Sequence, residues 1–171
     1  MLRFIFIDGY NVINSWPNLK EIKEYNYGQA RKDLLDTLQN YSSFNQCKIY
    51  LVYDAHKVKG NIEKQEEMGG VTVVFTKDGE TADSFIEKKV NDIGKKVEVT
   101  VVTSDNLEQQ TIFQRGATRM SSLDFYNEVL IINQKIRKKA EKCMIGNKKN
   151  LLGDRLEEDV WIKLEEMRRS K

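Results

Sequence analysis

The stretch LRFIFIDGYNVI, residues 2–13, places a continuous apolar run directly before an aspartate, Asp8, and a glycine. A run of this kind predicts a strand at 2–7 that is buried on both faces, as in parallel sheets covered by helices. Two later runs have a similar form: IYLVYD ends at Asp54, and VTVVTSD ends at Asp105. Because ligand crevices lie at the carboxyl ends of parallel strands, this repeated pattern predicts acids along one functional edge of a sheet.

Strand-like and helix-like patterns alternate along the rest of the chain. Further strands are predicted at 47–54, 71–76 and 97–104, with a brief edge strand at 116–120; helices are predicted at 27–43, 81–90 and 106–114, from Ser121 into the segment 135–149, and from Asp154 to Met167. The polar segment 60–70 is interpreted as a loop or short helix. This alternation predicts an α/β fold with a mostly parallel central sheet.

The length of 171 residues fits one domain with an ordinary core. We predict a main domain over 1–145 and a helical extension over 146–171 that packs on the same domain. No apolar run approaches the roughly 20 residues of a membrane span, and the amino-terminal segment lacks a signal-peptide cleavage site. Cys47 and Cys143 form no motif, which is typical of proteins whose thiols stay reduced. The expected location is therefore cytoplasmic, without a membrane partner.

The net charge of +2 is unevenly distributed. Residues 135–149 carry seven Lys or Arg and one acid, while residues 1–134 are net negative. A basic segment beside a body with metal-type carboxylates suits a polyanionic substrate such as nucleic acid. The alternative is that the basic segment is a solvated helix face, as most charge runs are. Lys138, Lys139 and Lys142 can share one stripe of a helix and are the candidate phosphate contacts.

A fourth aspartate, Asp83, lies near the start of the predicted helix at 81–90 and joins Asp8, Asp54 and Asp105 as a candidate metal ligand. Clustered carboxylates repel one another unless they hold a hard cation, and oxygen ligands without histidine favour Mg²⁺ or Mn²⁺. Each acid also has a structural interpretation. Asp8 with Gly9 could form a turn, Asp83 could favour a helix dipole, and Asp105 could cap the next helix.

Other polar residues near these acids are candidates for substrate contacts. Asn11 could orient a carboxylate or water, or simply cap a turn. Glu87 shares a helix face with Asp83, although it could equally pair with nearby lysines. Lys57 and Lys59 follow the second strand and could hold a nucleic-acid backbone. Two aromatic residues, Tyr10 and Trp16, could stack on an unpaired base, although Trp16 more often would pack in a core.

Other phosphate and metal chemistries lack their motifs in this chain. Tyr10 stands where a haloacid-dehalogenase phosphatase needs its second aspartate, and a receiver domain needs paired acids after its first strand. Neither a P-loop nor a dinucleotide-binding glycine motif is present. One histidine, His56, and two distant cysteines make no zinc site, and no nucleophile elbow accompanies His56.

Five motifs in order along the chain resemble those of the YacP-like NYN domain family, within the PIN-like nuclease superfamily. They are DGYNVI at 8–13 with Trp16, VYDAHKVKG at 52–60, GETADSFIE at 79–87, VVTSD at 101–105 and RGATRMSSLDF at 115–125. The resemblance runs to about residue 145. It departs from the family pattern only at Leu123-Asp124-Phe125, where a small residue, an acid and Leu are expected.

The resemblance implies an α/β/α sandwich and a cytosolic, metal-dependent ribonuclease. By this match Asp8, Asp83 and Asp105 are the core ligands and catalytic residues, with Asn11 and Asp54 close by. The expected function is hydrolysis of single-stranded RNA, with mRNA as substrate and a ribosome-associated setting as one option. RNA rather than DNA comes from the resemblance alone.

Two other functional classes stay open at this point. A non-catalytic RNA-binding or ribosome-docking module would keep the fold without needing the carboxylates. A phosphohydrolase or phosphotransfer protein for a small ligand would need a phosphate-binding loop, and the sequence shows none.

Overall fold

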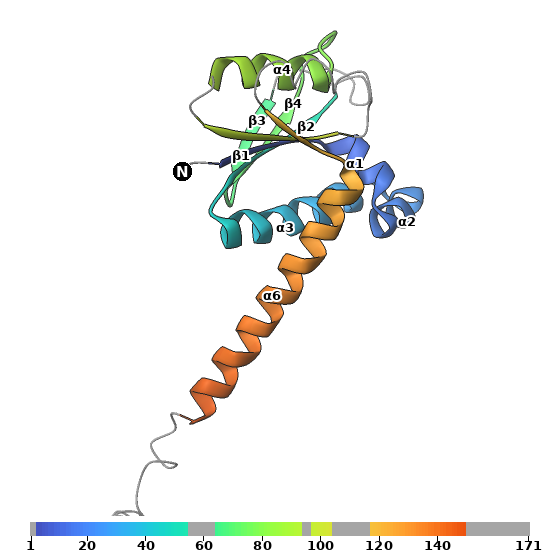
Figure 1. Ribbon diagram of the computed structural model, residues 1–171. Helices are drawn as coiled ribbons and strands as arrows, with labels where there is room; N and C mark the ends of the chain where they lie inside the picture. The colour runs from blue at the N-terminus through green and yellow to red at the C-terminus, as the bar shows by residue number, and fades with distance from the viewer. Residues whose placement is uncertain (1–2, 55–63, 94–96, 104–116, 150–171) are drawn as a thin grey trace, which may run out of the picture. The chain divides into compact units, whose positions relative to one another are not determined.

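The computed structural model describes residues 3–54, 64–93, 97–103 and 117–149 (Figure 1). Two compact units divide the chain, Met1–Asn133 and Gln134–Lys171, and each is described by itself. The predicted helices at 106–114 and 154–167 lie outside the described residues. The domain arrangement, with an extension over 146–171, therefore stays a prediction. No described helix is both long and apolar enough to cross a bilayer.

The first unit is built on a six-stranded, mostly parallel sheet with the order β3-β4-β2-β1-β5-β6. Its strands are β1 (Arg3–Asp8), β2 (Lys48–Tyr53), β3 (Lys64–Met68), β4 (Val71–Phe75), β5 (Glu98–Val102) and β6 (Thr118–Met120). All neighbours pair in parallel except β3 with β4. The predicted parallel sheet, and the brief edge strand near 116–120, are confirmed.

The prediction of a loop or short helix at 60–70 is wrong, because β3 occupies 64–68. This strand forms an antiparallel hairpin with β4, in which Met68 pairs with Val71. Gly69 and Gly70 form the turn with φ angles of 57° and 82°. Two successive positive φ angles suit glycine and match the twist of a two-residue hairpin. Pairing with β4 therefore holds this segment as a strand, although its polar sequence does not predict a strand.

Helices cover both faces of the sheet (Figure 1). α4 (Ala82–Ile93) lies on one face, and α3 (Tyr27–Asn45) lies on the other with α1 (Gly9–Ser15), α2 (Pro17–Tyr25) and the beginning of α6 (Ser122–Lys149). The predicted helices near 27–43 and 81–90, and the long helix after Ser121, are confirmed. The three-layer α/β/α sandwich is confirmed with them.

The short helices α1 and α2 have no counterpart in the sequence predictions. Each begins with a local signal: the Asp8 side chain caps α1, and Pro17 stands at the first position of α2. Trp16 separates them and is 1% exposed. Its indole N–H donates to the backbone oxygen of Ser122 at 2.9 Å, which ties this turn to the start of α6.

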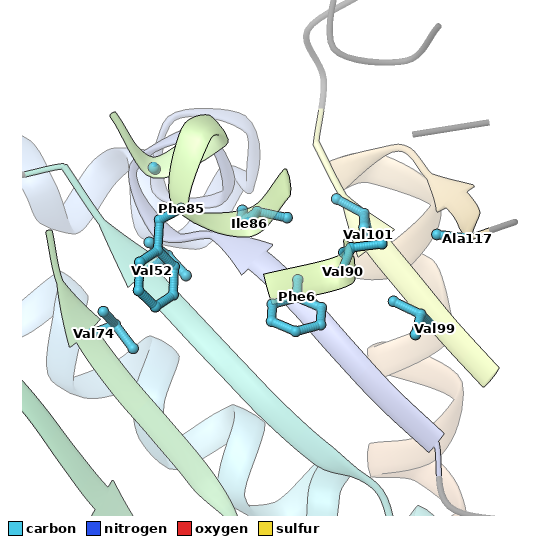
Figure 2. Packing of buried hydrophobic residues seen from close by; sticks show 10 residues of the cluster. Phe6, Val52, Val74, Phe85, Ile86, Val90, Val99, Val101 and Ala117 are labelled. Carbon is cyan, nitrogen blue, oxygen red and sulfur yellow. The ribbon is translucent and has the colours of Figure 1, made fainter. Parts of the chain in front are cut away.

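A hydrophobic cluster fixes α4 on the sheet (Figure 2). Phe85, Ile86 and Val90 of α4 pack against Phe6 of β1 and Val52 of β2. Since side chains alternate along a strand, the residue two positions after each strand contact points to the same face. This alternation directs the side chain of Asp8, two positions after Phe6 in β1, toward the layer that contains α4.

Candidate functional site

Asp8 lies at the carboxyl end of β1, two residues after Phe6. Its Cα pairs with Val52 across to β2. Its carboxylate Oδ1 accepts a hydrogen bond from the backbone N–H of Asn11 at 3.1 Å, which caps α1. Capping and a chemical role are compatible here, because a carboxylate can accept several hydrogen bonds or metal contacts on its two oxygens.

Asp83 lies in the first turn of α4, which the cluster around Phe85 and Ile86 holds on the same face of the sheet. The cap of this helix is supplied by another residue: Thr81 Oγ1 accepts from the backbone N–H of Ser84 at 3.2 Å. Asp83 Oδ1 is buried and has no hydrogen-bond partner among the described residues. A buried carboxylate oxygen without a partner is costly, so a ligand that binds it would offset that cost.

The charges of Asp83 and Asp54 reach Asp8. Burial is the main cause that raises the pKa of Asp8 above its ordinary value, and the neighbouring carboxylates of Asp83 and Asp54 raise it further. The hydrogen bond from the Asn11 backbone acts in the opposite direction. The structure therefore brings three of the four predicted acids into one electrostatic neighbourhood at the carboxyl edge of the sheet.

The remaining predicted site residues are placed less completely. Asp105, Lys57 and Lys59 lie outside the described residues. β5 leads toward the site, since its last residue, Val102, pairs with Ile7 of β1. Within the described ranges, no group of three or more acids, histidines or cysteines is close enough to hold a metal ion. A three-carboxylate centre would thus need Asp105, and the metal assignment stays a prediction.

Glu87 lies one turn after Asp83 on α4 and is half-buried. This position agrees with the predicted shared helix face. Its role, as ligand or as ion-pair partner, stays a prediction.

Asn11 is held by a network that the sequence does not reveal. Ser122 Oγ donates to Asn11 Oδ1 at 3.0 Å, and Ser122 is fully buried. The start of α6 is itself fixed by a capping box, in which Ser121 Oγ accepts from the backbone N–H of Asp124 at 3.1 Å. The capping box is visible in the sequence, but the 111-residue separation of Ser122 from Asn11 is not bridged by any local signal.

Gly9 and Tyr53 form a second feature that the sequence did not single out. A Cβ on Gly9 would stand 2.3 Å from Tyr53 Cε1, so only glycine fits beside this ring. Tyr53 is 2% exposed, and its hydroxyl has no hydrogen-bond partner in the described part of the chain. Burial strongly raises the pKa of Tyr53, which keeps the hydroxyl protonated. Tyr53 therefore packs close behind the residue that follows Asp8.

The suggestion that Tyr10 and Trp16 stack on RNA bases is wrong for this structure, because their exposed fractions are 8% and 1%. Trp16 instead packs against Phe125 and Tyr126, with ring centroids 6.0 and 5.2 Å away. The alternative interpretation of Trp16, as a core residue, is the one that the structure supports.

The second unit carries the predicted basic residues on α6. Lys135, Lys138, Lys139 and Lys142 are all helical and exposed. Their steps of three and four residues place them on one side of the helix. We call this set the basic stripe.

Comparisons with known proteins agree over nearly the whole chain. Residues 5–169 match the model of the YacP-like NYN domain. The protein named "Uncharacterized protein YacP" of Bacillus subtilis (strain 168) is 37% identical over 166 residues, which cover 96% of each chain.

Solved structures give the same result. The crystal structure of Rae1 (YacP) from Bacillus subtilis matches with a TM-score of 0.74 and 34% identity, covering 98% of this chain and 95% of that one. Its W164L mutant matches with a TM-score of 0.73 and 33% identity over 84% of each chain. On the evidence of its motifs, its sheet and these matches, the chain belongs to the YacP-like NYN domain family.

Proposed function

We propose that this protein is a metal-dependent endoribonuclease that hydrolyses phosphodiester bonds in single-stranded RNA, with mRNA as its substrate. Membership of the YacP-like NYN family gives the chain a nuclease-type fold. The observation that carries the proposal is the pair of Asp8 and Asp83: one carboxyl has a raised pKa, and the other has a buried oxygen without a partner among the described residues. Perturbed acids at the carboxyl edge of a parallel sheet are typical of functional sites.

The residues present fit a hard divalent cation. Asp8 and Asp83 offer oxygen donors, and the Oδ1 of Asp83, which has no partner within the described ranges, would be satisfied by a cation or a hydrogen-bond donor. In the proposal Asp8, Asp83 and Asp105 hold the ion and Asp54 lies at its rim. When bound, Mg²⁺ or Mn²⁺ supplies an activated water and stabilises the charge that develops on the phosphate.

Other residues of the chain position the RNA. The side-chain oxygen of Asn11 accepts from Ser122, so its amide N–H₂ group is oriented and can donate to a phosphate or water. Lys57 and Lys59 follow β2 and would contact the backbone near the cut. Lys138, Lys139 and Lys142 of the basic stripe would bind phosphates without reading bases.

The cellular setting is the finer part of the proposal. Cys47 and Cys143 are both free thiols, which agrees with a reducing cytoplasm. The exposed basic stripe suits a large polyanion, and this supports mRNA decay in a ribosome-associated setting. Comparing cleavage of free mRNA with cleavage of ribosome-bound mRNA tests that setting.

The second candidate is a non-catalytic RNA-binding or ribosome-docking module of the same fold. The basic stripe alone would serve such a module. We call Asp8, Asp54 and Asp83, at the carboxyl edge of the sheet, the acidic edge. Burial and the neighbouring like charges oppose ionisation of Asp8. A module that only binds RNA would not need this unfavourable group of acids, which argues against the second candidate.

A cleavage assay separates the two candidates. Purified full-length protein is incubated with labelled single-stranded RNA in Mg²⁺, in Mn²⁺ and in EDTA. The proposal expects cleavage with either ion and none in EDTA, restored by adding back the metal. Binding without cleavage in every ion, on both free and ribosome-bound mRNA, would favour the non-catalytic module.

A further inference from the structure

A hollow of about 200 Å³ lies on the face of the sheet opposite α4, between α3 and the strands β2, β3 and β4. It is smaller than the roughly 300–1,000 Å³ of sites that take drug-sized ligands, so it suits a single small ring system. Its walls are mainly apolar and include Leu35, Met68 and Phe75, while Arg31 and Lys32 stand on α3.

A line of aromatic rings connects this hollow with the acidic edge. Tyr10, two residues after Asp8, packs edge-on against Tyr53 with ring centroids 5.1 Å apart. Tyr53 in turn stacks on Phe75 at 5.4 Å, and both line the hollow. The ring contacts therefore link the residues that follow Asp8 to the wall of the hollow at Phe75.

The charges around the hollow favour an anionic chain. Arg31 and Lys32 supply two cations from α3. One acid, Glu66, also lines the hollow, but Lys64 pairs with it at 2.5 Å. The net charge of these lining and neighbouring residues is therefore positive. Arginine and aromatic side chains both stack on unpaired bases.

Two residues of the walls, Phe75 and Tyr53, carry groups that a planar ligand could contact. Phe75 is half-buried, so part of its ring faces the hollow. The Tyr53 hydroxyl is a buried donor with no partner among the described residues. A planar ligand with ring or carbonyl acceptors would cover the first and could satisfy the second.

We propose that this hollow is a base-binding subsite, which takes one unpaired nucleobase flanking the cleaved bond and stacks it between Phe75 and the Arg31 guanidinium. This inference rests on the proposed function for the identity of the chain as RNA. It adds a place where the enzyme would hold a base as well as phosphates. The subsite would set where along a strand the cut falls.

The test is a binding cycle with modified RNA. A fluorescent single-stranded RNA is prepared as a series in which one base at a time is replaced by an abasic ribose, which keeps every phosphate. Affinities are measured with the full-length protein in Ca²⁺ instead of Mg²⁺, to observe binding without turnover. The proteins are wild type, Phe75→Leu, Arg31→Lys and the control Phe44→Leu, an exposed aromatic elsewhere on α3.

For wild type and Phe44→Leu we expect one abasic position to weaken binding by about 5- to 100-fold, the range of base–aromatic stacking. In Phe75→Leu, and in Arg31→Lys if Phe75→Leu does not fold, that position should lose most of its effect while the others are unchanged. Equal abasic profiles in wild type and both variants would overturn the subsite and leave the nuclease proposal standing. Failure to bind any RNA would overturn both.

Discussion

The acidic edge and the basic stripe differ in almost every physical respect. Asp8 and Asp83 are largely withdrawn from solvent, held by the packing of α4 and by the cap of α1. Lys138 and Lys142 stand exposed on α6 and need only the helix for their spacing. The first arrangement depends on tertiary structure and fixes geometry, whereas the second depends on local structure and contributes charge.

This difference teaches that cutting and holding RNA can be separated in this chain. Carboxylates at low exposure act at short range and are little affected by salt. Exposed lysines attract a polyanion over a longer range, and their contribution falls as salt is added. Changes at the edge should therefore alter the chemical step, and changes on the stripe should alter affinity.

The largest effect is expected for Asp83→Asn. Asparagine keeps the shape but removes the charge that would hold the cation, whose stabilisation of the transition state amounts to several kcal/mol. We expect kcat for cleavage of single-stranded RNA to fall by roughly 100-fold or more. Folding should be intact, because Thr81 rather than Asp83 caps α4.

The matched control is Asp92→Asn, an exposed aspartate on the same helix, which should cleave like wild type. Single-turnover cleavage and melting curves of both variants provide the comparison. Full activity in Asp83→Asn would show that the acidic edge takes no part in cleavage. It would also contradict the proposed difference in function between the acidic edge and the basic stripe.

A smaller effect is expected when Lys138, Lys139 and Lys142 are all changed to Glu. Losing three phosphate contacts on a single strand should lower the slope of log affinity against log salt by about 2. Binding should weaken by roughly 10-fold or more at low salt, while kcat at saturating RNA is unchanged.

An equal change of charge elsewhere is the control for this variant. It is provided by the Glu triple variant of three exposed lysines on α2, β2 and α4, namely Lys20, Lys48 and Lys88. Equal loss of affinity in both triple variants would mean that net charge, and not the basic stripe, attracts the RNA.

The smallest effect concerns stability without metal. The folded state raises the pKa of Asp8 above its ordinary value of 3.8, so the folded state binds this proton more tightly than the unfolded state does. Stability contributed by the protonated form is present below about pH 4 and is lost as pH rises through the raised pKa. Asn at position 8 does not ionise, so Asp8→Asn removes this loss of stability at higher pH. Its side-chain oxygen can still accept the hydrogen bond from the backbone N–H of Asn11 that caps α1.

In EDTA at pH 7 we therefore expect Asp8→Asn to melt at a higher temperature than wild type. The gap should close near pH 4. Mg²⁺ should raise the melting temperature of wild type more than that of the variant. A variant less stable than wild type at both pH values would show that Asp8 serves mainly as a structural residue.

The apolar runs in the sequence predict most strands of the sheet. The polar strand β3 is not predicted by any pattern within its own sequence. The run before Asp8 indicates a buried strand by itself, and so does VTVVF at β4. β3 has the polar sequence KQEEM, whose strand geometry comes from pairing with β4 and from the turn at Gly69 and Gly70. That information is tertiary and is absent from the periodicity of the segment.

The candidate site shows the same limit. The position of Asp8 after an apolar run predicts the edge on which it lies. The contribution of Ser122 does not follow from its neighbours, because it lies 111 residues from Asn11 and meets it only after α6 docks. The close approach of Gly9 to Tyr53 likewise depends on the neighbouring strand.

The most direct test of the central claim is a crystal soaked in Mn²⁺ and measured for anomalous scattering. We predict a peak between the carboxylates of Asp8 and Asp83, with oxygen ligands at about 2.0–2.2 Å. These ligands should include the Oδ1 of Asp83, a buried oxygen that no described residue contacts by a hydrogen bond. Loss of that peak in Asp83→Asn crystals would show that the Asp83 carboxylate is needed to bind the ion. A map without density at this edge, at Mn²⁺ concentrations that support cleavage, would contradict the metal-held acidic edge.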